Sequence, residues 1–201
     1  MTIFALMPRA DLQRWQSART LADLGTMTAL WLEGLVGSQP GYQPRCGPAD
    51  ETTALVPVLA TACRAGYVTT ASQPSLPLDG AGWDQRAAVH GFAGPVMALR
   101  IADAALAAGL EVIATQPGRR PGPADEAVVT RRHGRPVTSF GTMPRRVYCD
   151  AVTGWGLCHR DAVTALCQAW QVTIADPQWG RPELVWRTLA AVALAPAGGA
   201  R

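Results

Sequence analysis

Four polar side chains stand where predicted secondary-structure elements begin or end, the places where a folded chain can meet a ligand. Glu51 and Thr52 open a predicted helix, whose first backbone N–H groups lack intrahelical partners and face the positive end of the helix dipole. Thr69 and Ser72 follow on a predicted strand within the hydroxyl-rich stretch GYVTTASQPS. A carboxylate, several hydroxyls and unpaired N–H groups in one place could hold a small zwitterion. Ordinary capping and strand hydrogen bonds are the other interpretation, and both stay open.

Motifs of the common enzyme classes are missing from the sequence. It has no GxGxxG or GxxxxGK[ST] phosphate-binding loop, no HExxH metal motif and no GxSxG nucleophile elbow. A zinc site is not indicated because the histidines are far apart, although Cys149, Cys158 and His159 leave one open on spacing. We therefore predict no catalytic residue and no metal. If the chain is an enzyme, Glu51 or Asp84 is the obvious acid or base.

Composition indicates one globular domain. The chain has 201 residues, of which 48% are apolar, enough to bury a sizeable core. No run of 18 apolar residues occurs, and the first residues lack the charged and apolar regions of a secretion signal. The five cysteines are scattered without CxxC spacing, which is typical of reduced thiols. We therefore expect a cytoplasmic protein that contacts no membrane.

All the basic residues are arginines, and 11 of the 18 lie beyond residue 114. The net charge of +3 does not by itself indicate nucleic-acid binding, which we consider unlikely. The local cluster of arginines fits a solvated loop and hairpin or a patch that meets an acidic partner. Its members are Arg119, Arg120, Arg131, Arg132, Arg135, Arg145 and Arg146.

Periodicity and turn residues predict an α+β fold in a single domain. The predicted helices cover 11–34, 51–65, 95–109, 160–170 and 182–194, and the predicted strands cover 67–72, 86–92, 111–115, 127–132, 136–140, 147–153 and 172–176. Gly25 is a candidate break in the first helix, and Asp50 and Gly66 are candidate caps of the second. Pro57 either kinks that helix or marks a later start, and the pair at 133–134 predicts a hairpin turn.

The segment 51–74, ETTALVPVLATACRAGYVTTASQP, resembles the C-terminal regulatory domain of eukaryotic methylenetetrahydrofolate reductase. In that domain a glutamate–threonine pair begins a helix, and a strand reading LTxNSQP follows at the same distance. Further segments match in the same order: 14–24 with RWGNSSSPAFGEL, 84–92 with FQKAYLEFF, 139–144 with TWGIFP, 160–170 with KDEAFALWIERW and 184–186 with LWQVV. The chain also resembles short actinobacterial proteins that share its RTLADLG and SQP pattern.

The resemblance implies two mixed sheets side by side with surrounding helices, and a domain that binds S-adenosylmethionine or S-adenosylhomocysteine without performing chemistry. The ligand-binding residues that it implies are Glu51, Thr52, Thr69, Ser72 and Ser139, with Thr138 as the alternative to Ser139. It places the domain at 14–194, after an N-terminal extension of residues 1–13 and before a disordered tail of residues 195–201.

Four departures from the family pattern are visible. The catalytic barrel is missing with its flavin and folate sites, so no flavin is expected. Most of the linker that contributes ligand contacts in the family is missing as well. Phe4 is the residue that could replace the linker as an aromatic lid. Ala71 stands where the family has the asparagine before SQP, and Ser139 stands at the TWGIFP threonine.

Three functional hypotheses follow. The first is a stand-alone domain that binds S-adenosylmethionine or S-adenosylhomocysteine and regulates a protein partner, as a monomer or a homodimer. The second is an enzyme that acts on S-adenosylmethionine or a related nucleoside. The third is a ligand-free interaction module that uses the arginine hairpin.

Overall fold

Two antiparallel sheets form the scaffold of the computed structural model, which describes residues 7–150 and 154–196. The larger sheet has the strand order β1-β3-β7-β4, and the smaller has the order β2-β5-β6. The strands are β1 Tyr67–Gln73, β2 Trp83–Gln85, β3 Ala88–Ala93, β4 Glu111–Thr115, β5 Glu126–Arg132, β6 Arg135–Gly141 and β7 Trp170–Ala175. The α+β class is confirmed, but within the described residues both sheets are purely antiparallel rather than mixed.

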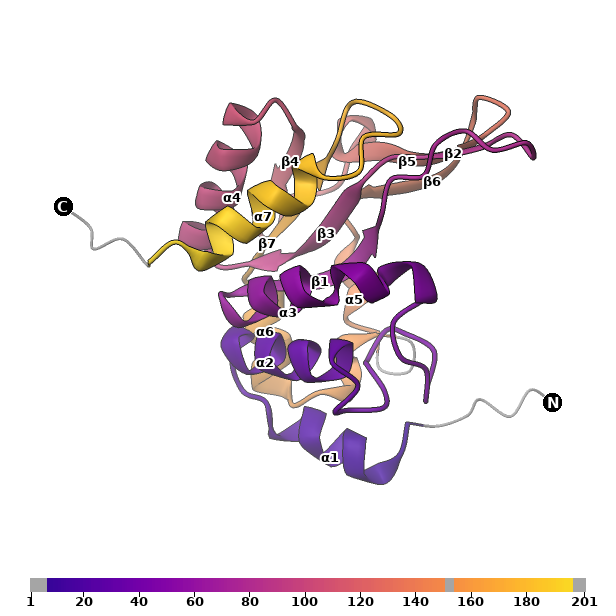
Figure 1. Cartoon of the computed structure of the whole chain (residues 1–201). Helices are drawn as coiled ribbons and strands as arrows, with labels where there is room; N and C mark the ends of the chain where they lie inside the picture. The colour runs from indigo at the N-terminus through magenta and orange to yellow at the C-terminus, as the bar shows by residue number, and fades with distance from the viewer. Residues whose placement is uncertain (1–6, 151–153, 197–201) are drawn as a thin grey trace.

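Seven α-helices surround the sheets in the described part of the chain. They are α1 Arg9–Ser17, α2 Leu21–Leu32, α3 Val56–Arg64, α4 Pro95–Ala107, α5 Arg145–Tyr148, α6 Arg160–Cys167 and α7 Leu184–Leu194. Short 3₁₀ segments are η1 Asp50–Leu55, η2 Pro123–Asp125 and η3 Trp155–Leu157. Figure 1 shows α4, α7, α3 and α2 following one another in front of the larger sheet, with α1 beyond α2. None of the described helices is long and apolar enough to cross a bilayer.

The main hydrophobic core lies between the larger sheet and the helices. Its largest fully buried side chains include Trp15, Leu24, Leu59, Tyr67, Phe92, Ile101, Leu166, Ile174 and Leu189. A second, smaller core of buried residues consists of Ala88, Ile113, Ala127, Val129 and Ala175. Because these five residues come from strands of both sheets, the smaller core packs one sheet against the other.

Gln73, the glutamine of the SQP motif, joins the two sheets by hydrogen bonds. Its Nε2 donates to the carbonyl oxygens of Arg86 at 3.0 Å and Val129 at 2.7 Å, and the hydroxyl of Thr130 donates to its Oε1 at 3.1 Å. The side chain is 6% exposed, so these bonds satisfy buried polar groups that would otherwise cost stability. The motif therefore includes a structural residue at the junction of the sheets.

Several local predictions are confirmed. Strands β1 and β4 occupy the predicted segments, and His133 (φ 49°) and Gly134 (φ 75°) form the predicted turn between β5 and β6. Gly66 follows α3 with φ 102°, the left-handed conformation expected of a helix-ending glycine. Pro57 marks a later start: the segment begins as η1, and α3 starts at Val56.

One prediction near the N-terminus is wrong. The helix predicted at 11–34 breaks at residues 18–20 instead of Gly25, because Thr20 and Asp23 form a reciprocal capping box that starts α2. Gly25 lies inside α2, where an added Cβ would stand 2.3 Å from the carbonyl oxygen of Cys63. This glycine lets α2 approach α3. Helix α1 also begins at Arg9, within the stretch predicted as an N-terminal extension.

Three other predictions also need correction. Asp50 makes no capping bond, since η1 begins at this residue and its N-cap is Ala49. The segment predicted as a strand at 147–153 begins as the end of α5, and residues 151–153 lie outside the described residues. The short strand β2 was not predicted. Phe4, and the predicted tail from residue 197 onward, also lie outside the described residues.

Candidate functional site

The structure brings four of the predicted ligand-binding residues to one cavity of about 300 Å³. Glu51, Thr52, Thr69 and Ser72 all line it, and we call it the Glu51 cavity. Its other lining residues are Trp31, Leu32, Gln39, Tyr42, Pro48, Ala49, Thr70, Ala71, Gln73 and Phe140. The predicted juxtaposition of the Glu51 segment with the hydroxyl-bearing strand is therefore present, with open space between them.

The fifth predicted residue, Ser139, lines a second cavity of about 320 Å³, which we call the His90 cavity. Its other lining residues are Gln39, Pro40, Gly41, Tyr42, Thr70, Ala71, His90, Phe140, Gly141, Met143, Val147, Tyr148, Gly154 and Trp155. The two cavities share Gln39, Tyr42, Thr70, Ala71 and Phe140, so they adjoin each other. Thr138, the predicted alternative to Ser139, is exposed and lines neither cavity.

The Glu51 segment presents a side chain to its cavity, but it does not form the predicted α-helix start. Glu51 is exposed in the first turn of η1, and the Thr52 N–H already donates to the carbonyl oxygen of Ala49 at 2.8 Å. Because η1 is a 3₁₀ segment, the regular α-helix begins only at Val56, after Glu51 and Thr52. The contribution of this segment is the Glu51 carboxylate and the buried Thr52 side chain.

Strand β1 contains an irregularity, which separates a hydroxyl that bonds within the core from one that lines the cavities. The register against β3 shifts between Thr69 and Ala71, which leaves Thr70 as the extra residue. The hydroxyl of Thr69 is 3.2 Å from the Cys63 sulfur in α3, so it has a partner in the core. Thr70 lines both cavities and makes a long bond of 3.4 Å to the carbonyl oxygen of His90.

The loop of residues 37–49, which follows α2, forms one wall of both cavities. Trp15 donates its indole N–H to the Ser38 carbonyl at 2.8 Å, and Trp31 donates to the Cys46 carbonyl at 3.0 Å. The Trp31 ring also meets Tyr42 edge-on at 5.4 Å between centroids. Two core tryptophans therefore fasten a loop whose sequence alone indicated only turns.

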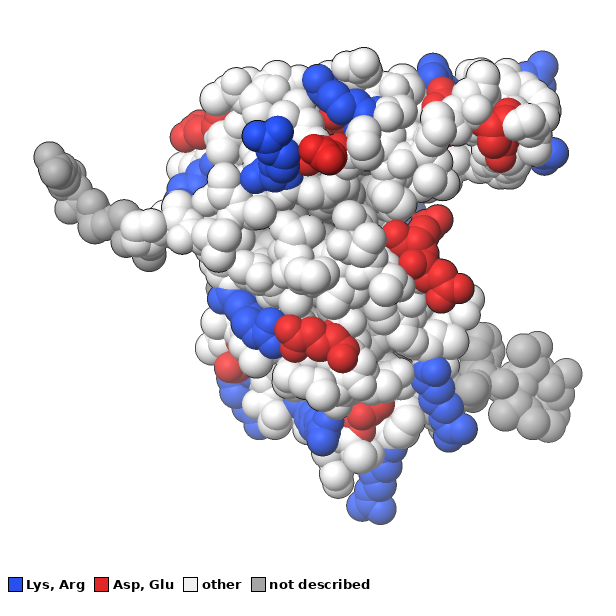
Figure 2. All heavy atoms as spheres, in the orientation of Figure 1, with Lys and Arg blue, Asp and Glu red and all other residues white. Residues whose placement is uncertain are grey.

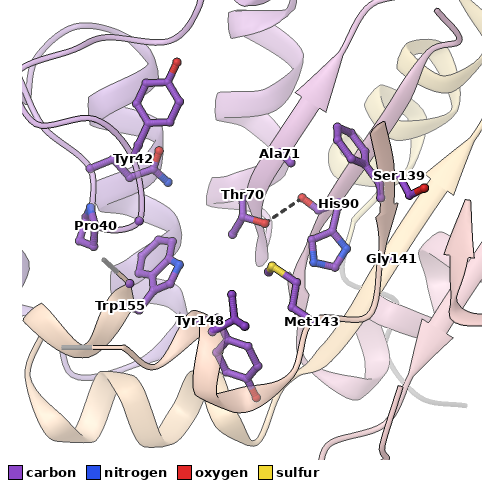
Figure 3. Close-up of a pocket in the computed structure, with 15 residues that line it drawn as sticks. Pro40, Tyr42, Thr70, Ala71, His90, Ser139, Gly141, Met143, Tyr148 and Trp155 are labelled. Atoms are coloured by element: carbon purple, nitrogen blue, oxygen red, sulfur yellow. Dashed lines mark hydrogen bonds between the residues drawn. The ribbon is translucent and has the colours of Figure 1, made fainter. Parts of the chain in front are cut away.

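His90 has an unusual environment in the second cavity. The side chain is 3% exposed, and its Nδ1 lies 2.8 Å from the Thr173 hydroxyl. Its Nε2 is buried and has no hydrogen-bond partner among the described residues. Burial lowers the pKa of His90 to about 4, so the ring is neutral at pH 7. Figure 3 shows the imidazole beside Met143, facing Pro40 and Trp155 across the pocket.

The two cavities differ in charge. No Asp, Glu or Arg is among the described residues that line the His90 cavity, whereas Glu51 supplies a carboxylate to the other. Burial also raises the pKa of Tyr148 to about 12, which keeps its phenol neutral. In Figure 2 acidic side chains gather at the right-hand edge, at the height of η1 in Figure 1, below the projecting smaller sheet. The pair of cavities thus offers an acidic end and a neutral aromatic end.

Sequence reasoning missed the residues of the aromatic end. Tyr42, His90, Tyr148 and Trp155 come from a loop, a central strand, α5 and η3, with no common spacing in the sequence. The histidines lie far apart in the sequence, so spacing gives no reason to select His90. No local pattern distinguishes it from an ordinary core histidine, since what sets it apart is a buried, unpaired nitrogen on a residue that lines a cavity.

The other chemical candidates lie elsewhere or are engaged in structural bonds. Asp84 pairs with Arg131 at 2.6 Å and lines neither cavity. The five cysteines are free thiols, and the Cys149 and Cys167 sulfurs lie 2.9 Å apart. No group of three or more His, Cys, Asp or Glu residues is arranged to hold a metal ion in the described part of the chain. These groups therefore do not add an acid, base or metal site to the two cavities.

The arginines of the predicted cluster lie in more than one place: Arg131, Arg132 and Arg135 are on the β5–β6 hairpin, and Arg119, Arg120 and Arg145 line a common cavity. Arg119 pairs with Asp125 at 2.7 Å, and Arg131 both pairs with Asp84 and stacks on Trp179 at 3.5 Å from the ring centroid. Figure 2 shows arginines scattered over the visible face, interspersed with acidic side chains. The two ion pairs fit the solvated-surface interpretation of Arg119 and Arg131.

Comparison with known proteins leaves the function open. No curated protein matches the sequence. Residues 10–196, nearly the whole described fold, match the model of a domain of unknown function, DUF6919. The chain therefore belongs to the DUF6919 family.

Proposed function

We propose that this protein binds S-adenosylmethionine or S-adenosylhomocysteine as a stand-alone sensor domain that regulates a protein partner. One observation carries the proposal. The resemblance implies Glu51, Thr52, Thr69 and Ser72 in the segment 51–74 and Ser139 in a second, distant segment, and all five residues line two adjoining cavities. Ser139 lies far from the other four residues in the sequence, so its position beside them depends on the tertiary structure.

The chemistry of the cavities suits the proposed ligands. Adenosylmethionine carries an amino-acid group and a sulfonium cation, both of which a carboxylate such as Glu51 can contact favourably. The hydroxyls of Ser72 and Ser139 can donate to or accept from a ribose diol or an amino-acid group. Each cavity has about 300 Å³ of space, and together they fall within the range of small-molecule sites.

A sensor agrees with the lining residues better than an enzyme does. Glu51 is the one carboxylate among the described lining residues, and it is exposed. Asp84, the other predicted acid or base, is held in its ion pair with Arg131. We further propose that the protein acts in the cytoplasm, where its five free thiols stay reduced.

Calorimetric titration with both ligands tests the proposal. We expect dissociation constants in the micromolar range, about −8 kcal/mol. Glu51→Gln and Ser139→Ala should each weaken binding by roughly 3- to 10-fold, the equivalent of one hydrogen bond. Their controls are Asp50→Asn and Thr138→Ala, since each control residue is an exposed sequence neighbour outside the cavities.

Two results would count against the proposal. No heat at millimolar concentrations of both ligands would end it, and equal affinities of the Glu51 and Ser139 variants and the wild type would refute the site. Mass spectrometry of the ligand after incubation distinguishes the enzyme hypothesis. An intact ligand that binds supports a sensor, whereas a converted ligand identifies an enzyme.

A further inference from the structure

We infer that the His90 cavity receives the nucleobase of the ligand, and that the Nε2–H group of His90 donates a hydrogen bond to a ring nitrogen of that base. The inference rests on the proposed function and adds the orientation of the ligand and a residue outside the resemblance. The His90 side chain is 3% exposed and lines the cavity, and its Nε2 is unpaired. A buried polar atom without a partner, on a residue that lines a cavity, gains from a ligand that hydrogen-bonds to it.

The hydrogen-bond network assigns the proton to Nε2. If Nδ1 carried the proton and donated to Thr173, the threonine O–H and the Nε2 lone pair would both lack a partner among the described residues. If Thr173 donates to Nδ1 instead, only the Nε2–H group remains unpaired. The second arrangement leaves fewer buried groups unsatisfied, so it is favoured. The cavity therefore contains a hydrogen-bond donor and selects an acceptor.

The absence of charge among the described lining residues decides which part of the ligand lies here. An amino-acid zwitterion in the His90 cavity would lose its hydration without meeting an opposite charge, which is costly. A nucleobase is uncharged and planar, and its ring nitrogens accept hydrogen bonds. The charged end then lies in the adjoining cavity, where Glu51 can face the ammonium or sulfonium cation.

The walls of the cavity also suit a flat ring. Figure 3 shows Pro40 and Trp155 on one side and Thr70, His90 and Met143 on the other. The indole of Trp155 is itself held from behind by an edge-on contact with Trp15 at 5.6 Å between centroids. An indole and a thioether are favourable neighbours for a base, because both are polarisable and need no charge.

Nitrogen-15 NMR of the wild-type imidazoles tests the inference without any substitution. The chain has three histidines, and a spectrum of His90→Asn identifies the signal of His90. We expect the free protein to show the Nε2–H tautomer, and we expect adenosine and adenosylhomocysteine to shift that nitrogen. Methionine alone, which lacks a base, should leave it unchanged.

Paired variants then measure the bond. His90→Asn keeps a polar atom near the Nδ1 position, beside Thr173, and loses the donor, whereas His90→Gln can place an amide N–H near the Nε2 position. We expect affinity for adenosylhomocysteine to fall about tenfold in His90→Asn and to recover in His90→Gln. Each of 1-deaza-, 3-deaza- and 7-deazaadenosine lacks one ring nitrogen of adenosine. The wild type should bind one of the three about tenfold more weakly than it binds adenosine, whereas His90→Asn should bind that compound and adenosine equally well.

The outcomes separate the inference from the proposed function. Adenosylhomocysteine binding that leaves His90 Nε2 unshifted overturns the inference and preserves the function. If adenosine shifts this nitrogen and neither adenosyl ligand binds, the base subsite is supported and the proposed function is overturned. A protein that binds none of these compounds overturns both.

Discussion

Replacing Gln73 with leucine removes three hydrogen bonds between the sheets while nearly conserving the volume of the side chain. The Val129 carbonyl keeps a partner, because the backbone N–H of Arg86 also donates to it at 3.0 Å. The Arg86 carbonyl and the Thr130 hydroxyl each lose their bond to the Gln73 amide in a region where Gln73 is 6% exposed. Each such loss costs about 1–2 kcal/mol, so we expect Gln73→Leu to lower the free energy of unfolding by about 2–4 kcal/mol.

Urea denaturation followed by tryptophan fluorescence measures this loss, and the slope should stay that of the wild type if only the native state changes. Thermal unfolding should shift downward by about 4–16 °C, since 1 kcal/mol corresponds to 2–4 °C at this chain length. Gln85→Leu is the control: its side chain donates one bond, to the Pro74 carbonyl at 2.9 Å, and should cost about 1 kcal/mol.

A double-mutant cycle with Thr130→Val isolates the bond between the two side chains. The pair should be coupled by about 1 kcal/mol, because each single change removes the same 3.1 Å bond. If Gln73→Leu unfolds within about 0.5 kcal/mol of the wild type, the amide does not hold the sheets together, and the structural interpretation of the SQP glutamine is refuted.

Two further predictions concern packing and pH. Helix propensity predicts that Gly25→Ala stabilises α2 by about 1 kcal/mol, but the added Cβ would stand 2.3 Å from the Cys63 carbonyl oxygen, so we expect a net loss of about 2 kcal/mol. Gly47→Ala, with open space around it, is the control, and equal urea midpoints would contradict the argument. The pKa of His90 falls from 6.5 in the unfolded chain to about 4, so the native state binds fewer protons and stability decreases as the pH falls from 6.5 towards 4, by about 3 kcal/mol in total. His90→Asn should lose this part of the pH dependence in urea titrations from pH 7 to 4, and an unchanged dependence would show that His90 is not its source.

Most of the secondary structure was predictable because its signals are local. Pro95 at the start of α4, the turn at His133 and Gly134, and the left-handed Gly66 after α3 act through the backbone conformation of one or two residues. Such preferences do not depend on the rest of the fold. The errors arose where local signals compete: the capping box at Thr20 ended α1 and started α2 more effectively than Gly25.

The candidate site was predictable in part. Glu51 and Ser72 could be placed together because η1 and α3 lead directly into β1, so a short loop at Gly66 returns the chain alongside itself. Ser139 came from the resemblance alone, and its choice over Thr138 required the structure, since neighbouring strand residues point to opposite faces.

Sequence alone determined that the chain is one α+β domain, where most of its elements lie, and which polar residues converge near Glu51. Only the tertiary structure decided that Gln73 joins the two sheets, that His90 lines a cavity and that its buried Nε2 has no partner. The physical reason is distance along the chain. Local conformation depends on adjacent residues, whereas Gln73 finds Thr130, and His90 finds Thr173, more than fifty residues away, once the sheets have paired.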